Sequence, residues 1–129
     1  MTQHIQLSQV RKEMQQCIQN CFNCHSICLN TINYCLQKGG MHTEPAHIRL
    51  MLDCAEICQI SANFMLRNSD FHIRTCGICA EVCDRCARDC DRVASPQENR
   101  MGNDAQMKAC ADMCRRCADS CRQMAMATV

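Results

Sequence analysis

Cysteine side chains recur along three segments of the chain in alternating steps of three and four residues, with polar and charged side chains at many of the positions between them. Steps that average 3.5 residues place these thiols on one face of a helix, the buried seam of left-handed helix packing. A strand would need a step of two. The pattern therefore predicts three helices. Their ladders are Cys17-x₃-Cys21-x₂-Cys24-x₃-Cys28, Cys76-x₂-Cys79-x₃-Cys83-x₂-Cys86-x₃-Cys90 and Cys110-x₃-Cys114-x₂-Cys117-x₃-Cys121.

A fourth segment keeps the same seam with fewer cysteines. Cys54 and Cys58 are preceded in register by His47 and Met51, and Met65 follows one heptad later. Imidazole and thioether groups thus continue the seam where thiols are missing. We expect this segment to be the fourth helix of a bundle.

Turn-forming residues separate the four segments. Gly39-Gly40 is suited to the end of a helix, and Thr43-Glu44-Pro45 predicts a helix start with a capping side chain and an early proline. Residues 67–70 and 94–104 predict two further breaks. Short connections make neighbouring helices antiparallel. We predict an all-α fold, an antiparallel up-down-up-down four-helix bundle with a cysteine-lined core. Residues 1–129 form a single domain in this prediction, with helices over 9–37, 46–66, 71–94 and 104–126.

The composition shows what must fill the core of this bundle. Leu, Ile, Val and Phe account for 22 of 129 residues, about 17%. A fraction this low is typical of disordered chains only when the net charge is high, and the net charge here is +1. Sixteen cysteines, about 12% of the chain, are therefore the candidates for the interior.

Charge and targeting signals narrow the function classes. The chain has 14 basic and 13 acidic side chains, so neither a nucleic acid nor a membrane is expected as a partner. The first residues lack the features of a secretory signal, and the sequence has no stretch of the roughly 18 apolar residues that a membrane span needs. We expect a cytoplasmic protein whose thiols stay reduced, and such cysteine-rich chains bind metal more often than they form disulfides.

Charge balance favours a monovalent metal. Four zinc ions in a lumen of sixteen thiolates would leave a charge of about −8 inside the protein, which is heavily penalised because the seam carries no Lys or Arg. One soft monovalent ion per thiolate brings the charge to zero, and thiolate and thioether ligands favour Cu(I). Sharing of thiolates between ions allows roughly eleven to sixteen Cu(I) per chain. The interpretation is metal storage.

Two alternatives remain open. Paired cysteines on facing helices can form Cys₄ sites, which favours a zinc-buffering protein. A redox-active thiol protein that cycles through disulfides is the other. Because no single cysteine stands out beside a base or a charge, we do not expect an enzyme.

The two ends of the predicted bundle differ in the residues that extend the seam. At one end, His47, Met51 and Met107 lie with Cys35 and the Met41-His42 loop, which makes this end a candidate metal entrance. At the other end His72 is also in register, so the choice of end stays open; the residues beside it there are Met14, Met65 and Met124. His4 and His25 are off the seam. A further apolar stripe fits either packing inside the bundle or a subunit interface: Ile18, Phe22, Leu29, Ile32 and Leu36.

Taken together, the ladders of Cys17–Cys28, Cys79–Cys90 and Cys110–Cys121 resemble those of the bacterial copper storage proteins over the whole chain. The resemblance implies a homotetramer of cysteine-lined four-helix bundles, of the cytosolic branch, for copper storage, detoxification and homeostasis. It implies many Cu(I) ions per chain, loaded from a copper chaperone or a small-thiol donor, with His or Met helping near an end. The ligands that it implies are Cys17, Cys21, Cys24, Cys28, Cys35, Cys54, Cys58, Cys76, Cys79, Cys83, Cys86, Cys90, Cys110, Cys114, Cys117 and Cys121, with His47, Met51 and Met107 as the residue types found near an opening.

Overall fold

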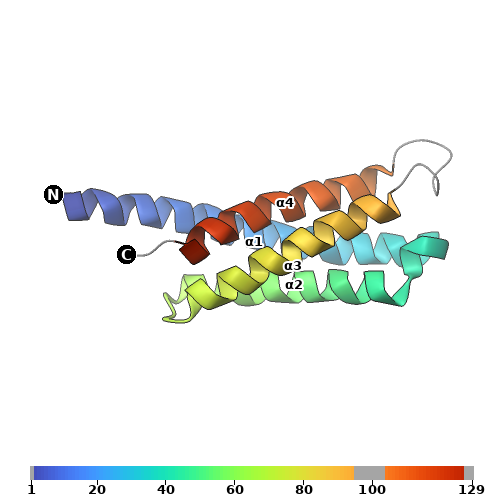
Figure 1. Ribbon diagram of the computed structural model, residues 1–129, viewed down its shortest axis with the longest axis horizontal. Helices are drawn as coiled ribbons and strands as arrows, with labels where there is room; N and C mark the ends of the chain where they lie inside the picture. Colours follow the sequence, from blue (N-terminus) through green and yellow to red (C-terminus); the bar gives the residue numbers. More distant parts are fainter. Residues whose placement is uncertain (1, 95–103, 127–129) are drawn as a thin grey trace.

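Four helices run antiparallel to one another in chain order (Figure 1). The computed structural model describes the backbone of residues 2–94 and 104–126, and the side chains from residue 11 onward within those ranges. The predicted bundle is confirmed, and the helix bounds agree within two residues except that the first helix begins near the start of the chain; the predicted break over 95–103 lies outside the described residues. The elements are α1 (Thr2–Lys38), a short 3₁₀ turn η1 (Gly40–Thr43), α2 (Pro45–Leu66), α3 (His72–Val93) and α4 (Ala105–Met126).

Each helix packs against its two neighbours around a central lumen, with α1 diagonal to α3. The most extensive contact joins α3 and α4. Small buried residues explain it, because Ala80 and Ala87 of α3 and Ala111 and Ala118 of α4 let the two backbones approach closely. A Cβ atom at Gly77 would lie only 3.8 Å from the Cβ of Ala125.

Sulfur-containing side chains make up most of the core. All sixteen cysteines have no exposed surface, and the other buried hydrophobic residues are mostly Met and Ala. The prediction that the seam positions face the interior is therefore confirmed. A thiol is a small, weakly polar group, so a core of protonated thiols is neutral and can be buried without charge partners.

The connection between α1 and α2 differs in one respect from the prediction. Gly39 and Gly40 adopt φ values of 79° and 62°, the left-handed conformation that ends α1, and Pro45 begins α2. The predicted capping side chain is wrong. The Thr43 hydroxyl donates to the Gly40 carbonyl at 2.8 Å, and the Glu44 carboxylate pairs with an Arg92 guanidinium nitrogen at 2.8 Å instead. A contact with α3 thus replaces the local cap.

The outer faces are held by ion pairs between helices. Arg115 of α4 pairs with Asp91 of α3 at 2.7 Å, and Arg122 pairs with Asp84. Because these side chains are about half exposed, each pair contributes about 0–1 kcal/mol. None of the helices within the described ranges has the length and the apolar character of a membrane span.

The apolar stripe of α1 is partly buried and partly exposed, so each of the two interpretations left open by the sequence fits a part of it. Ile32 is buried, and Ile18 and Phe22 are partly buried against the core. Leu29 and Leu36 are 45% and 58% exposed. Part of the stripe therefore packs inside the bundle, and part faces outward.

Candidate metal centre

The thiols of α1 and α4 face one another in a strict antiparallel register. Each step of three or four residues toward the start of α1 is matched by an equal step toward the end of α4. Four sulfur–sulfur pairs result, and their separations of 3.6–3.9 Å are those of weak S–H···S hydrogen bonds. The pairs are Cys17–Cys121 at 3.6 Å, Cys21–Cys117 at 3.7 Å, Cys24–Cys114 at 3.7 Å and Cys28–Cys110 at 3.9 Å.

The α2–α3 half follows the same rule. Cys54 lies 3.7 Å from Cys83, and Cys58 lies 3.8 Å from Cys79. Both α2 thiols also reach α4, where Cys54 meets the sulfur of Cys114 at 3.9 Å. The two halves therefore meet in stacked layers of four thiols, one from each helix. The two complete layers are Cys21, Cys58, Cys79, Cys117 and Cys24, Cys54, Cys83, Cys114.

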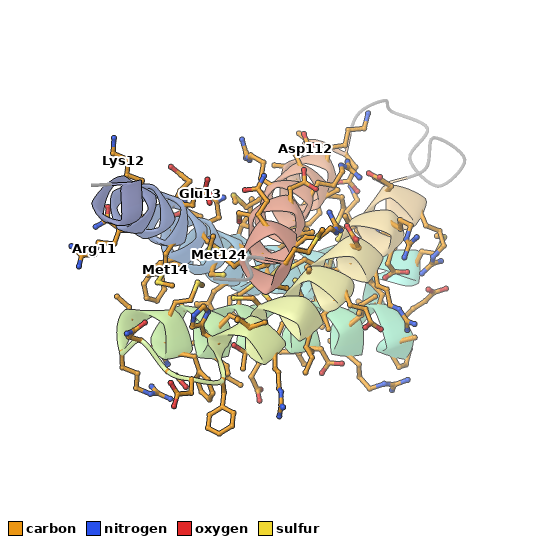
Figure 2. All side chains as sticks on the ribbon, turned by 60° about the vertical axis from the view of Figure 1, so that its left-hand side comes forward. Arg11, Lys12, Glu13, Met14, Asp112 and Met124 are labelled. Atoms are coloured by element: carbon orange, nitrogen blue, oxygen red, sulfur yellow. The ribbon has the colours of Figure 1, made fainter. Side chains whose placement is uncertain are left out.

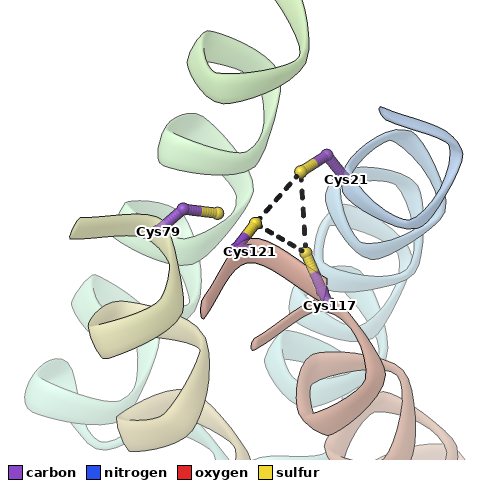
Figure 3. Close-up of side chains that lie close together, drawn as sticks. All are labelled: Cys21, Cys79, Cys117 and Cys121. Atoms are coloured by element: carbon purple, nitrogen blue, oxygen red, sulfur yellow. Dashed lines mark hydrogen bonds between the residues drawn. The ribbon is translucent and has the colours of Figure 1, made fainter. Parts of the chain in front are cut away.

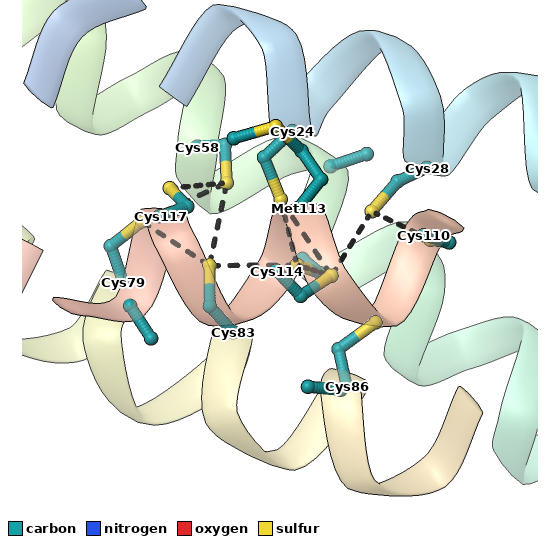
Figure 4. Close-up of a cluster of buried hydrophobic side chains, with 14 of the residues drawn as sticks. Cys24, Cys28, Cys58, Cys79, Cys83, Cys86, Cys110, Met113, Cys114 and Cys117 are labelled. Atoms are coloured by element: carbon teal, nitrogen blue, oxygen red, sulfur yellow. Dashed lines mark hydrogen bonds between the residues drawn. The ribbon is translucent and has the colours of Figure 1, made fainter. Parts of the chain in front are cut away.

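The sulfurs lie at distances that suit shared metal ions. One metal held between two thiolates separates their sulfurs by about 4.5 Å, at metal–sulfur bonds near 2.3 Å. Four groups in the lumen have all their sulfurs within 4.8 Å of one another. Figure 3 shows the first of them, and Figure 4 shows the neighbouring sulfurs of the middle of the lumen, from Cys79 and Cys117 to Cys28 and Cys110. The groups are Cys21, Cys79, Cys117, Cys121; Cys24, Cys28, Cys54, Cys114; Cys24, Cys58, Cys83, Cys117; and Cys17, Cys76, Cys121.

Two hydroxyl residues occupy seam positions at which the ladders would place a cysteine. Neither was identified from the sequence. Thr31 and Ser61 each lie three residues beyond a ladder cysteine and are fully buried. The Thr31 hydroxyl accepts a hydrogen bond from the Gln106 amide at 2.8 Å. The Ser61 hydroxyl has no hydrogen-bond partner in the part of the chain that the structure describes. Extending the alternation of three and four from Cys28 and Cys58 would have found both positions.

At the end of the lumen near the α1–α2 turn, an imidazole meets the last sulfurs. His47, Met51 and Met107 are fully buried, as their seam positions predicted. The Nε2 atom of His47 lies 3.4 Å from the Cys35 sulfur, which donates to the Met107 thioether at 3.5 Å. Its Nδ1 atom lies 2.6 Å from an Asp89 carboxylate oxygen. Because a carboxylate only accepts, Nδ1 carries a proton and Nε2 faces the sulfurs.

A second carboxylate holds the same end together. One oxygen of the buried Asp104 accepts from the Tyr34 hydroxyl at 2.7 Å and from the Met107 backbone N–H at 3.3 Å. The other lies 2.6 Å from the His42 Nε2 atom. Burial alone would raise the pKa of Asp104, but hydrogen bonds from His42 and Tyr34 outweigh burial and lower it. Because His42 is engaged in this way, its Nε2 atom is a structural group here.

Neither carboxylate was singled out from the sequence. Asp104 directly precedes α4 and caps it, which is a recognisable signal. Asp89 carries no such signal, since its role depends on where α2 lies against α3.

The pKa values of the lumen thiols are shifted in opposite directions. The hydrogen bond with Cys114 lowers the pKa of Cys24, whereas the hydrogen bond with Cys110 raises the pKa of Cys28. For Cys35, burial and then the Asp104 charge raise the pKa to about 12. Metal that binds the thiols with raised pKa values must therefore displace their protons.

The remaining histidines differ in their surroundings. His25 is half-buried between α1 and α2, and its Nδ1 atom lies 2.7 Å from the Ala55 carbonyl, off the lumen as predicted. His72 lies at the opposite end of the lumen from His47. The side chain of His4 lies outside the described residues.

Solved structures share this fold. Nmul_A1745 of Nitrosospira multiformis is 44% identical, with a TM-score of 0.76 over 89% of this chain and 96% of that one. The Cu(I)-bound copper storage protein BsCsp3 is 30% identical, with a TM-score of 0.75 over 88% and 98%. A cytosolic copper storage protein from Streptomyces lividans, solved with five coppers, is 26% identical, with a TM-score of 0.74 over 92% and 97%.

Sequence comparisons lead to the same family. The cysteine-rich protein YhjQ of Bacillus subtilis is 31% identical over 67 residues, which are 52% of this chain and 62% of that protein. The profile of the copper storage proteins matches residues 10–126, nearly the whole chain. The chain belongs to the copper storage protein family.

Proposed function

We propose that this chain stores and detoxifies Cu(I) by holding many ions inside the bundle as copper thiolates. The observation that carries the proposal is the continuous column of sixteen fully buried sulfurs. Family membership and the Cu(I)-bound relative support it. A chain that needed metal only for structure would use one or two sites.

The surroundings of the thiols support a monovalent ion. Among the described residues, the buried polar side chains are two hydroxyls, one aspartate and two histidines, and no Lys or Arg is buried beside the sulfurs. Thiolates would therefore have to be neutralised by the metal itself. Cu(I) achieves this at one ion per thiolate, whereas zinc in Cys₄ sites leaves an excess of negative charge.

The proposed ligands are the sixteen cysteines, with His47, Met51 and Met107 as weaker ligands at an entrance. In this proposal the entrance lies at the His47 end, where Asp89 orients the imidazole toward Cys35. Copper that binds there passes inward by ligand exchange to the thiol layers, and each thiol that binds it releases a proton.

The wider setting is part of the same proposal. Residues 1–129 act as one storage domain in the cytoplasm, as the Streptomyces relative does, without an enzymatic step. A small thiol or a copper chaperone delivers the metal. The chain assembles as a homotetramer, and the exposed Leu29 and Leu36 of α1 offer an apolar face for such a contact.

The test is an anaerobic titration of the reduced protein with Cu(I) against a chromophoric chelator, followed by metal counting. Tight uptake of roughly ten or more ions per chain supports storage, as the sharing of thiolates requires. Saturation near four would favour the Cys₄ groups and zinc buffering. Absence of tight uptake, with rapid formation of ordered disulfides, would favour a redox protein.

A further inference from the structure

The lumen ends in a second layer of soft ligands, at the end opposite His47. Extending the α1–α4 register beyond Cys17 and Cys121 places Met14 opposite Met124. Extending the α2–α3 register beyond Cys58 and Cys79 places Ser61 opposite Cys76. One further step places Met65 opposite His72. Figure 2 turns this end toward the reader. The outermost layer therefore consists of three thioethers and one imidazole: Met14, Met65, His72 and Met124.

By the same register, this layer is the next one outward from the last thiols. Met65 and Met124 are each only 2% exposed, and Met14 is half-buried. The sulfurs of Cys17, Cys76 and Cys121 beneath them lie within 4.8 Å of one another, with Cys17 and Cys121 at 3.6 Å. The register thus places the thioethers one layer outside the last thiols.

His72 differs from the other described histidines in one respect. His25, His42 and His47 each have a ring nitrogen at 2.6–2.7 Å from an oxygen. The Nδ1 atom of His72 is buried and has no hydrogen-bond partner among the described residues. The Ser61 hydroxyl, one layer inward, likewise lacks a hydrogen-bond partner among the described residues, and Ser61 has no exposed surface. A buried polar group without a partner destabilises the fold, so a ligand for Nδ1 would offset that cost.

We propose that this end is a second Cu(I) site, in which His72 Nδ1 and the thioethers of Met14, Met65 and Met124 supply the ligands. Thioether sulfur and imidazole nitrogen suit a soft monovalent cation. All four ligands are neutral, so the ion keeps its charge there and is drawn to the thiolates that form beneath.

The inference rests on the proposed storage function and adds a second opening to the lumen. Copper stays Cu(I) as it moves inward: its bonds to nitrogen and thioether sulfur break, its bonds to Cys17, Cys76 and Cys121 form, and their protons leave to solvent. The lumen would then load from both ends.

The first experiment follows the histidine ring nitrogens by NMR in the full-length, reduced protein during anaerobic Cu(I) titration. The variant H72Q identifies the His72 signal. His25 is the matched control, because it is also half-buried but its Nδ1 atom is engaged by the Ala55 carbonyl. We expect the His72 Nδ1 signal to shift on loading while the His25 signal stays in place.

The outcomes separate the two proposals. Tight uptake to full capacity with an unmoved His72 signal would overturn the second site and leave storage intact; Nδ1 would then be bound to a buried water. Failure of tight uptake would overturn both.

A loading experiment tests the opening itself. With the other end disabled by H47Q, adding H72Q should slow Cu(I) loading by about tenfold, the lower range for loss of a metal-site residue, whereas adding H25Q should not. The double variant M65L/M124L, which keeps side-chain volume, should slow loading in the same background and guards against a folding defect of H72Q. Unchanged rates in both variants would contradict the proposal.

Discussion

The two ends of the lumen use the same ligand types but are held in different ways. At the His47 end, two carboxylates, the partly buried Asp89 and the buried Asp104, bind the imidazoles, and Asp104 also caps α4. At the His72 end, the buried Nδ1 and the Ser61 hydroxyl have no hydrogen-bond partner within the described part of the chain. One end is therefore arranged before metal arrives. At the other end, the described residues offer His72 Nδ1 no partner, and a bound ligand would supply one.

The difference shows how a metal-binding side chain can contribute differently to the stability of the apo fold and to metal affinity. Hydrogen bonds to a carboxylate orient a ligand and stabilise the apo fold at the same time. An unpartnered ligand costs stability in the apo state and recovers it on binding. Substitutions at the two ends should therefore change unfolding and metal uptake in different proportions.

The largest effect is expected for Asp104→Ala. It leaves the buried His42 and the Tyr34 hydroxyl without their acceptor and removes the cap of α4, so the apo protein should lose about 3 kcal/mol or more of unfolding free energy. Chemical denaturation under reducing conditions measures it. Asp112→Ala, on an exposed face, is the control and should change little. An equal loss in both variants would show that the Asp104 network contributes nothing specific.

Asp89→Ala should weaken metal binding more than folding. Without the carboxylate, the His47 ring is free to rotate or to carry its proton on Nε2, so Cu(I) affinity at this end should fall about 10- to 100-fold. The total number of ions bound should stay the same, because the thiol layers are intact. Stopped-flow transfer from a chromophoric Cu(I) complex, with metal counting, separates the two. Unchanged transfer would contradict the positioning role.

Loading should depend on pH at both ends. Burial and the Asp104 charge raise the pKa of Cys35 to about 12. For Cys76, the hydrogen bond with Cys121 acts downward, but the bond with Cys17 and burial outweigh it and raise the pKa to about 12. Both thiols are protonated between pH 6 and pH 9, so each one that binds Cu(I) releases one proton and its affinity should rise about tenfold per pH unit.

Chelator competition at several pH values in this range checks that slope, and a flat profile would contradict it. The apo fold should behave in the opposite direction. Because the folded pKa values lie above the ordinary value of 9.0, the stability that these thiols contribute is fully present below pH 9 and is lost as the pH rises toward 12.

The smallest effect is expected for Ser61→Ala. Removing a buried hydroxyl without a partner should leave the stability of the apo protein unchanged or slightly higher, by less than about 1 kcal/mol, in contrast to Asp104→Ala. Ser61→Cys should add a fourth thiol to the last cysteine layer and raise the Cu(I) capacity by about one ion. Thermal unfolding and metal counting test the pair. A marked loss of stability in Ser61→Ala would reveal a partner for this hydroxyl.

The helices and their buried faces were predictable because a period of 3.5 leaves a helix only one face for the thiols. Relations between helices were not. The pairing of His47 with Asp89 depends on the α2–α3 register, which spacing within one helix does not determine. The side-chain cap predicted at the start of α2 is absent for the same reason, since Glu44, which precedes α2, pairs with Arg92 of α3. The seam pattern also covers position 61, but Ser61 carries no sulfur and was not identified as part of the seam.

The sixteen buried thiols that fill the core also have a consequence for protein turnover. A ligand that binds only the folded state stabilises it, by about 2.7 kcal/mol for one site at a hundredfold excess over its Kd. With copper in successive layers, the chain would unfold far less often and would rarely expose a segment to a protease. The half-life of the polypeptide would then lengthen when copper is plentiful and shorten when it is withdrawn, so that degradation itself would adjust the number of molecules to the metal they hold.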